Sequence, residues 1–194
     1  MTKNLKKFLK SNITFTSTQA RKKGIPPSVL AYYVNNGIIE RISRGLYRNP
    51  KIENHVPAPW EDLVATAKSI PNGVVCLISA LNLYEMTDEF AHEHWIAIPK
   101  SDWPKRRKHT KIIRMNNLSL GLTKIKLGDE TIAIFDRERT IIDSFRLLSR
   151  EIAIKALKKY LQPNDKYKTN FKKLNRNAKE LHFDISPYVQ ALTV

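Results

Sequence analysis

The residues best suited to chemistry are three arginines near the start of the chain. Arg41, Arg44 and Arg48 lie around a Ser43-Arg44-Gly45 sequence that favours a tight turn between two short strands, 38–42 and 46–48. Such a hairpin would carry three guanidinium groups. Guanidinium groups in this arrangement bind phosphate oxygens or enter a narrow minor groove. The spacing therefore predicts a contact with nucleic acid.

The segment before this hairpin predicts two short helices joined by a turn that contains glycine. The first helix begins at Thr16 or Ser17 and ends at Gly24, and the second begins at Pro27 and closes at Gly37. The second helix has an inward face, and its outward face is small, hydrogen-bonding and almost uncharged, which suits a major groove. The inward residues are Leu30, Tyr33 and Val34, and the outward residues are Ser28, Ala31, Tyr32 and Asn35. A helix-turn-helix followed by a basic hairpin is a winged helix.

These elements predict a set of residues at the DNA face. Polar side chains from both helices would face the DNA, and basic side chains would contact phosphate or the minor groove. The polar set is Ser17, Thr18, Gln19, Ser28, Tyr32 and Asn35, and the basic set is Lys22, Lys23, Arg41, Arg44 and Arg48.

The charge distribution supports this prediction. Thirty-four Lys and Arg against 18 Asp and Glu give the 194 residues a formal net charge of +16. The net charge is +9 over residues 1–50, 0 over 51–136 and +7 over 137–194. A surplus of this size indicates an anionic partner, of which a phosphate backbone is the usual one. Basic proteins of membrane surfaces share such a surplus, but we expect no membrane partner here.

The pattern of elements predicts an α+β protein with two domains. Three prolines within residues 49–59 indicate a linker, so we expect a winged helix-turn-helix DNA-binding domain over 1–50, a linker over 51–59 and a mixed α+β domain over 60–194. In the second domain we expect strands over 73–78, 94–98, 111–115, 122–127 and 131–135, and helices over 60–70, 79–84, 137–148, 151–161 and 166–181. The last three helices give the domain a helical C-terminal part.

Several short motifs resemble one known family. GIIER at 37–41 and SRGLY at 43–47 are followed by SAL at 79–81 and ERTIID at 138–143. In this order they resemble AbiEi-type antitoxins of type IV toxin–antitoxin systems, which begin with a winged helix. The last fifty residues carry no such match.

The resemblance implies a function that the residues alone do not. AbiEi-type antitoxins repress their own operon by binding inverted repeats in its promoter. They also neutralise a nucleotidyltransferase-like toxin, often without a stable complex. The winged helix would serve repression, and the C-terminal domain would serve as the antitoxin domain. The implied partners are double-stranded promoter DNA and, functionally, the toxin.

Signals for an enzyme are weak. Ser79 lacks a nucleophile elbow and is predicted to cap a helix, and no Gly-x-x-x-x-Gly-Lys loop is present. His92 and His94 could share a metal on one strand face, but no third ligand is evident, so we expect neither a metal nor a cofactor. Asp136 should cap the helix that carries Arg139 and Asp143, which are spaced i, i+4 and would pair on its surface. We therefore predict that the protein is not an enzyme.

Two further basic clusters leave an alternative open. Lys105, Arg106, Arg107 and Lys108 fall in a predicted loop, and Lys155, Lys158 and Lys159 fall on a predicted helix. They could form a second surface for DNA or bind RNA, with tRNA as a candidate, or simply be solvated. The alternative function is thus an RNA-binding module that uses the basic C-terminal helices.

The sequence also favours a cytoplasmic location. Cys76 is the single cysteine, so no disulfide can form within the chain. The first 20 residues lack the apolar stretch of a secretory signal, and the longest apolar run, 74–78, is too short to span a membrane.

Overall fold

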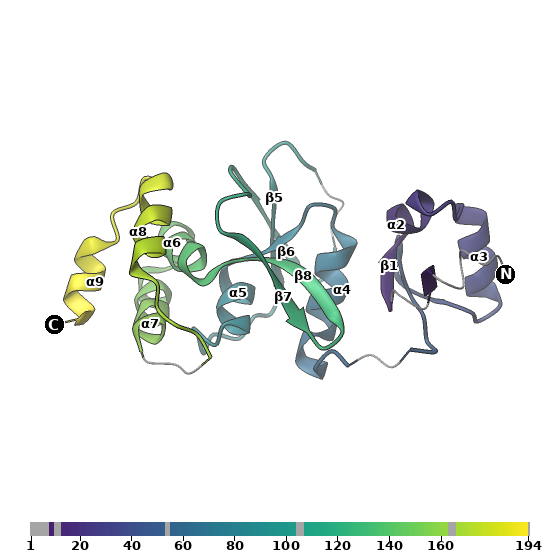
Figure 1. Cartoon of the computed structure of the whole chain (residues 1–194), viewed down its shortest axis with the longest axis horizontal. Helices are drawn as coiled ribbons and strands as arrows, with labels where there is room; N and C mark the ends of the chain where they lie inside the picture. Colours follow the sequence, from purple (N-terminus) through teal and green to yellow (C-terminus); the bar gives the residue numbers. More distant parts are fainter. Residues whose placement is uncertain (1–7, 10–12, 53–54, 104–106, 163–165, 194) are drawn as a thin grey trace. The chain divides into compact units, whose positions relative to one another are not determined.

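The protein is described by a computed structural model for residues 8–9, 13–52, 55–103, 107–162 and 166–193. The chain, coloured by sequence in Figure 1, divides into two compact units. The first unit contains residues 1–71 and 125–132, and the second contains residues 72–124 and 133–194. The first unit therefore draws on two separate stretches of sequence.

A winged helix forms the start of the first unit. Its elements are β1 (Thr14–Thr16), α2 (Ser17–Lys22), α3 (Pro27–Asn35), β2 (Glu40–Ser43) and β3 (Leu46–Arg48). The three strands are antiparallel in the order β1-β3-β2. A short 3-10 helix, η1 (Ala58–Trp60), and α4 (Glu61–Ser69) follow. The predicted helix-turn-helix and its hairpin are confirmed, and Gly24 and Gly37 follow the two helices as expected.

The core of the winged helix explains why such short elements are stable. A capping box begins α2, in which the Thr16 hydroxyl accepts from the Gln19 N–H (3.1 Å) and the Gln19 side chain accepts from the Thr16 N–H (2.7 Å). The helices then bury one apolar face each, and the buried cluster comprises Phe8, Leu9, Phe15, Ala20, Ile25, Leu30, Tyr33 and Ile39. Burial of this face supplies the stability that helices of six and nine residues lack alone.

Two details of the winged helix differ from the prediction. Strand β1 was not expected, because three residues are too few to show an alternating pattern. Phe15 of β1 is fully buried, and its ring stacks on Tyr47 with a centroid distance of 5.8 Å. Strand β2 begins at Glu40 rather than at Ile38, because the N–H groups of Ile38 and Ile39 both donate to the Tyr33 carbonyl and prolong the end of α3.

A five-stranded sheet is built mostly from residues of the second unit, and residues 125–132 of its last two strands belong to the first. Its strands are β4 (Val74–Val75), β5 (His94–Pro99), β6 (Thr110–Met115), β7 (Leu122–Leu127) and β8 (Glu130–Phe135), in the order β6-β5-β4-β8-β7. Strand β5 is antiparallel to β4, whereas β6 is parallel to β5 and β8 is parallel to β4. Strand β6 thus lies at one edge of the sheet.

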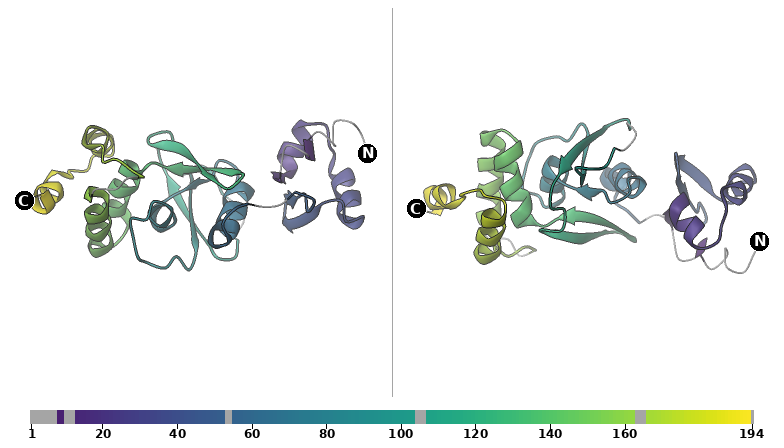
Figure 2. Two further views of the ribbon diagram at one scale, coloured as in Figure 1. Left: turned by 60° about the horizontal axis from the view of Figure 1, so that its bottom comes forward. Right: turned by 90° about the horizontal axis from the view of Figure 1, so that it is seen from above.

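The helices of the second unit are α5 (Leu77–Leu83), α6 (Arg137–Leu147), α7 (Arg150–Leu161), α8 (Phe171–Glu180) and α9 (Ser186–Thr193). Helix α6 packs against α7 and α8, and Figure 2 shows these C-terminal helices gathered together. The predicted fold class, a winged helix followed by a mixed α+β part with a helical C-terminus, is confirmed. Helix α9 was not predicted, and α8 begins at Phe171 rather than at 166, because the Asn170 side chain caps it.

The region around Ser79 corrects one prediction. The expected strand over 73–78 is only Val74–Val75, and α5 begins at Leu77, two residues before Ser79. Ser79 therefore lies inside the helix and is not its cap. Its buried hydroxyl accepts a hydrogen bond from the Trp95 N–H at 2.9 Å, which ties α5 to β5.

The pair formed by Arg139 and Asp143 is buried, and its predicted position on the helix surface is wrong. Their side chains are 1% and 0% exposed, and the Arg139 Nε donates to the Asp143 carboxylate at 2.6 Å. Arg139 also donates to the carbonyls of Asn117 and Leu120, both at 3.2 Å. Asp136 caps α6 as expected. The guanidinium thus anchors α6 to the loop before β7.

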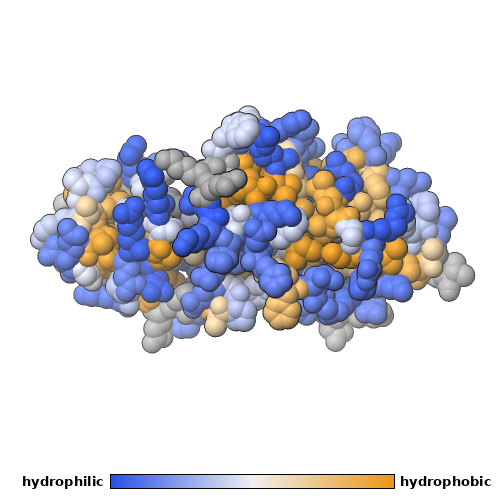
Figure 3. Space-filling view, turned by 180° about the vertical axis from the view of Figure 1, so that it is seen from behind, coloured by the Kyte–Doolittle hydropathy of each residue, from blue (hydrophilic) through white to orange (hydrophobic). Residues whose placement is uncertain are grey.

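The surface mixes polar and apolar groups. Hydrophilic residues occupy much of the face seen from behind, and apolar residues remain visible between them (Figure 3). Within the described ranges, no helix is both long and apolar enough to cross a membrane. No cluster of three metal-ligating His, Cys, Asp or Glu side chains occurs among the described residues, and His92 and His94 thus gain no third ligand there.

Candidate nucleic-acid interface

The outward face of α3 is the clearest part of the candidate interface. Ser28, Tyr32 and Asn35 are exposed, and Tyr32 keeps 61% of its surface accessible. Leu30 and Tyr33 point into the core on the opposite face, as predicted. The exposed positions follow the i, i+4, i+7 spacing of one helical face. A row of polar tips without bulky charge is able to enter a major groove and reach base edges.

Helix α2 places its predicted residues in two different roles. Thr18 is exposed, whereas the Gln19 side chain is engaged in the capping box with Thr16. Ser17 is half-buried, and its N–H donates to the Gly45 carbonyl at 2.8 Å. The start of α2 therefore contacts the turn of the wing directly. This bond fixes the position of the turn relative to the helix-turn-helix.

The end of α2 is cationic. Lys22 and Lys23, both in the predicted set, are exposed. Arg21 precedes them in the last turn of α2 and is exposed as well, but it was not in the predicted set. The run of three basic residues in the sequence was the signal that would have included it.

The three wing arginines are not equivalent. Arg44 is exposed in the turn between β2 and β3. Arg48 lies opposite Glu40 in the sheet and donates to its carboxylate through Nη2 at 2.7 Å, so much of its charge is neutralised within the protein. Arg41 is exposed but lines a cavity of about 230 Å³ together with the acidic Glu61. Arg44 is the wing arginine best placed to contact phosphate.

A buried carboxylate, that of Glu130, hydrogen-bonds to strand β1 of the winged helix. Glu130 is 5% exposed and accepts a hydrogen bond from the Thr14 N–H of β1 at 3.1 Å. The same carboxylate forms an ion pair with Lys68 of α4, and the Lys68 ammonium also donates to the Thr14 carbonyl. Because the Thr14 backbone groups are satisfied by side chains, β1 is held in place at the edge of its sheet.

The predicted second basic surface is partly neutralised by ion pairs. Lys155 pairs with Glu151 at 2.6 Å, and this hydrogen bond raises the pKa of Lys155. Lys159 pairs with Asp88 at 2.5 Å, whereas Lys158 is exposed. These pairs favour the solvated helix face over an RNA-binding role, which stays a prediction.

The basic loop is only partly described. Lys105 and Arg106 lie outside the described residues. Lys108 is exposed, and burial lowers the pKa of the half-buried Arg107. The role of this basic loop in binding DNA or RNA also stays a prediction.

The comparisons with known proteins agree with the geometry of the first unit. No curated protein matches the chain. Residues 5–50 match the model of a family described as a transcriptional regulator, AbiEi antitoxin. This stretch contains both helices and the wing, and it supports a DNA-binding antitoxin. The resemblance to AbiEi-type antitoxins is thereby confirmed over the N-terminal 5–50 segment.

Proposed function

We propose that the protein represses its own toxin–antitoxin operon by binding inverted repeats in the promoter. The observation that carries this proposal is the uncharged, exposed outward face of α3 together with an exposed Arg44 in the turn of the wing. A helix of this kind reads base edges in the major groove while a wing arginine contacts phosphate or the minor groove.

The proposed interface assigns different roles to the predicted residues. Ser28, Tyr32 and Asn35 face the bases, and Lys22, Lys23 and Arg44 contact the phosphates, with Ser17, Thr18 and Arg41 at the margin. Gln19 and Arg48 have structural roles in this proposal. Gln19 takes part in the capping box of α2, and Arg48 pairs with Glu40. We add Arg21 to the phosphate-binding set, because it is exposed in the same turn as Lys22.

We also propose that residues 60–194 act as the antitoxin domain against a nucleotidyltransferase-like toxin in the cytoplasm, with residues 51–59 as the linker from the DNA-binding residues 1–50. The support is the family match of the N-terminal segment together with the second compact unit, 72–124 and 133–194, which makes up most of this stretch. Co-expression with the toxin encoded beside the gene tests this proposal. Residues 60–194 alone should restore growth, whereas failure of both this fragment and the full chain would contradict it.

Titration of the operator against salt tests the DNA-binding proposal. Arg44→Ala should weaken binding to all duplexes and lower the slope of log K against log[salt] by about one unit, because one phosphate contact is lost. Asn35→Ala should instead cost about 1–3 kcal/mol on the operator only, because a base contact is lost. Arg176→Ala, which removes an exposed arginine from α8, is the matched control and should change neither quantity. If Arg44→Ala and Asn35→Ala also leave both unchanged, this surface does not bind the operator.

A further inference from the structure

The second unit has a cationic face that extends beyond the basic loop predicted from the sequence. Residues 51–136 carry no net charge, but the acids of this stretch are partly consumed by the C-terminal lysines. Glu85 pairs with Lys166 at 2.8 Å, and Asp88 pairs with Lys159 at 2.5 Å. With these two acids neutralised by lysines from outside the stretch, the basic residues of 51–136 outnumber the acids that remain.

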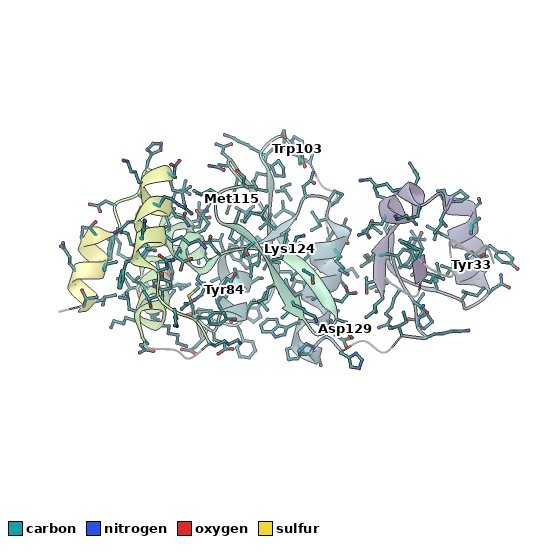
Figure 4. The ribbon with its side chains drawn as sticks, viewed as in Figure 1. Tyr33, Tyr84, Trp103, Met115, Lys124 and Asp129 are labelled. Carbon is teal, nitrogen blue, oxygen red and sulfur yellow. The ribbon has the colours of Figure 1, made fainter. Side chains whose placement is uncertain are left out.

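Two tryptophans lie against cations at this edge. The Arg114 guanidinium of β6 lies 4.0 Å from the centroid of the Trp103 ring, and the Lys111 ammonium lies 4.0 Å from that of Trp95. Trp103, in the loop that leaves β5, keeps 80% of its surface exposed (Figure 4). Exposure of so large a ring costs hydration free energy, so a ligand that covers it is stabilised.

Two cavities meet at Arg114. The first has a volume of about 650 Å³, and its charged and aromatic lining is Trp103, Arg107, Lys111 and Arg114 with Glu93 and Asp102. The second has a volume of about 340 Å³, and its lining includes Lys100, Arg114, Arg139 and Arg146 with Glu180, as well as His182. Six basic residues surround the two cavities, and two of them, Arg139 and Arg146, already pair with the buried Asp143. With Asp143 counted beside the three acids of the lining, six bases still stand against four acids, so the combined site attracts anions.

We propose that this face of the second unit binds single-stranded nucleic acid. A base stacks on the exposed ring of Trp103, and the neighbouring phosphates lie in the two cavities near Lys100, Lys111 and Arg114. Base stacking on an aromatic ring within a cationic groove is the general mode of single-strand binding. A duplex keeps its base faces covered, so it cannot use Trp103 in this way. The site is separate in residues and in ligand from the winged helix, which is proposed to bind a duplex.

Fluorescence anisotropy of the full chain with labelled oligo-dT and oligo-rU of about twelve nucleotides tests the proposal. Trp103→Ala should weaken binding by about 5- to 100-fold, because the stacking contact is lost. Phe90→Ala removes another exposed aromatic ring of the same unit, at 89% exposure, and should leave binding unchanged. Binding of oligo-dT and oligo-rU with equal strength indicates recognition of bases and phosphates, whereas a preference for oligo-rU identifies RNA as the ligand.

Further variants separate stacking from charge. Arg114→Lys keeps the charge but loses the planar group that lies on Trp103, and it should weaken binding, whereas Lys158→Gln on α7 should not. Arg44→Ala, which alters the winged helix, should leave single-strand binding unchanged. The proposal is overturned if no oligonucleotide binds, if Trp103→Ala has no larger effect than Phe90→Ala, or if a duplex competes equally for Trp103. An absence of oligonucleotide binding would point instead to a protein partner for the exposed tryptophan.

Discussion

Replacement of Arg139 by methionine tests whether the Glu-Arg-Thr segment is structural. Arg139 is 1% exposed and makes hydrogen bonds to Asp143, Asn117 and Leu120. Methionine fills a similar volume but donates no hydrogen bond. The Asp143 carboxylate, which is fully buried, would keep the hydrogen bond from Arg146 at 2.7 Å, and the Asn117 and Leu120 carbonyls would lose the Arg139 donor.

The size of the effect follows from these contacts. Removal of one partner from a buried ion pair costs about 3–5 kcal/mol, because the remaining charge stays buried without compensation. For a chain of this length, 1 kcal/mol shifts the melting temperature by about 2–4 °C, so Arg139→Met should lower it by about 6–20 °C. The matched control is Arg146→Met, which breaks a bond to the same carboxylate from a side chain that is 35% exposed. Arg146→Met should lower the free energy of unfolding by less than Arg139→Met, because the Arg139 guanidinium stays paired with the Asp143 carboxylate.

Thermal and urea unfolding followed by circular dichroism measure both variants. A double substitution of Arg139 and Asp143 by apolar residues should recover much of the lost stability, because no unpaired charge is then buried. If Arg139→Met is no more destabilising than Arg146→Met, the buried ion pair is not what anchors α6. The segment would then need a chemical explanation.

Two further predictions concern the second unit. Gly121→Ala should destabilise the protein by about 1–3 kcal/mol or more in urea unfolding, because φ is +67° and the new Cβ would lie 2.5 Å from the Cβ of Arg139. Gly24→Ala, at φ +75° but with open space around it, isolates the backbone strain and should cost less. Burial, followed by the charge of Asp143, raises the pKa of the Cys76 thiol, so at pH 8 the folded protein should react with a thiol reagent only as it unfolds. Rapid labelling of the folded protein would contradict the burial of Cys76.

The winged helix was largely predictable from the sequence because its signals are local. A cap at Thr16, glycines after both helices and a turn at 43–45 act within a few residues of the positions that they determine. The outward face of α3 follows from helical spacing alone. The sequence therefore predicted which residues of α3 are exposed and which are buried, and this part of the candidate site follows from it.

The remaining features depend on contacts between distant residues. The Arg48–Glu40 pair requires the register of β2 against β3, and the burial of Arg139 requires the loop before β7 to cover it. Ser79 was predicted to cap a helix, but α5 already begins at Leu77. The backbone turns there with a φ of +48°, which the pattern of hydrophobic residues does not indicate. The cationic face around Arg114 arises only once the sheet and its cavities exist.

The contacts of Glu130 have a consequence for how this protein can be recombined with its relatives. The carboxylate that holds Thr14 and Lys68 is encoded more than sixty positions after the lysine and more than a hundred after the threonine. A hybrid that exchanges only residues 1–71 would place a foreign edge strand against an unmatched acid. Functional chimaeras should therefore inherit residues 125–132 from the same parent as the winged helix.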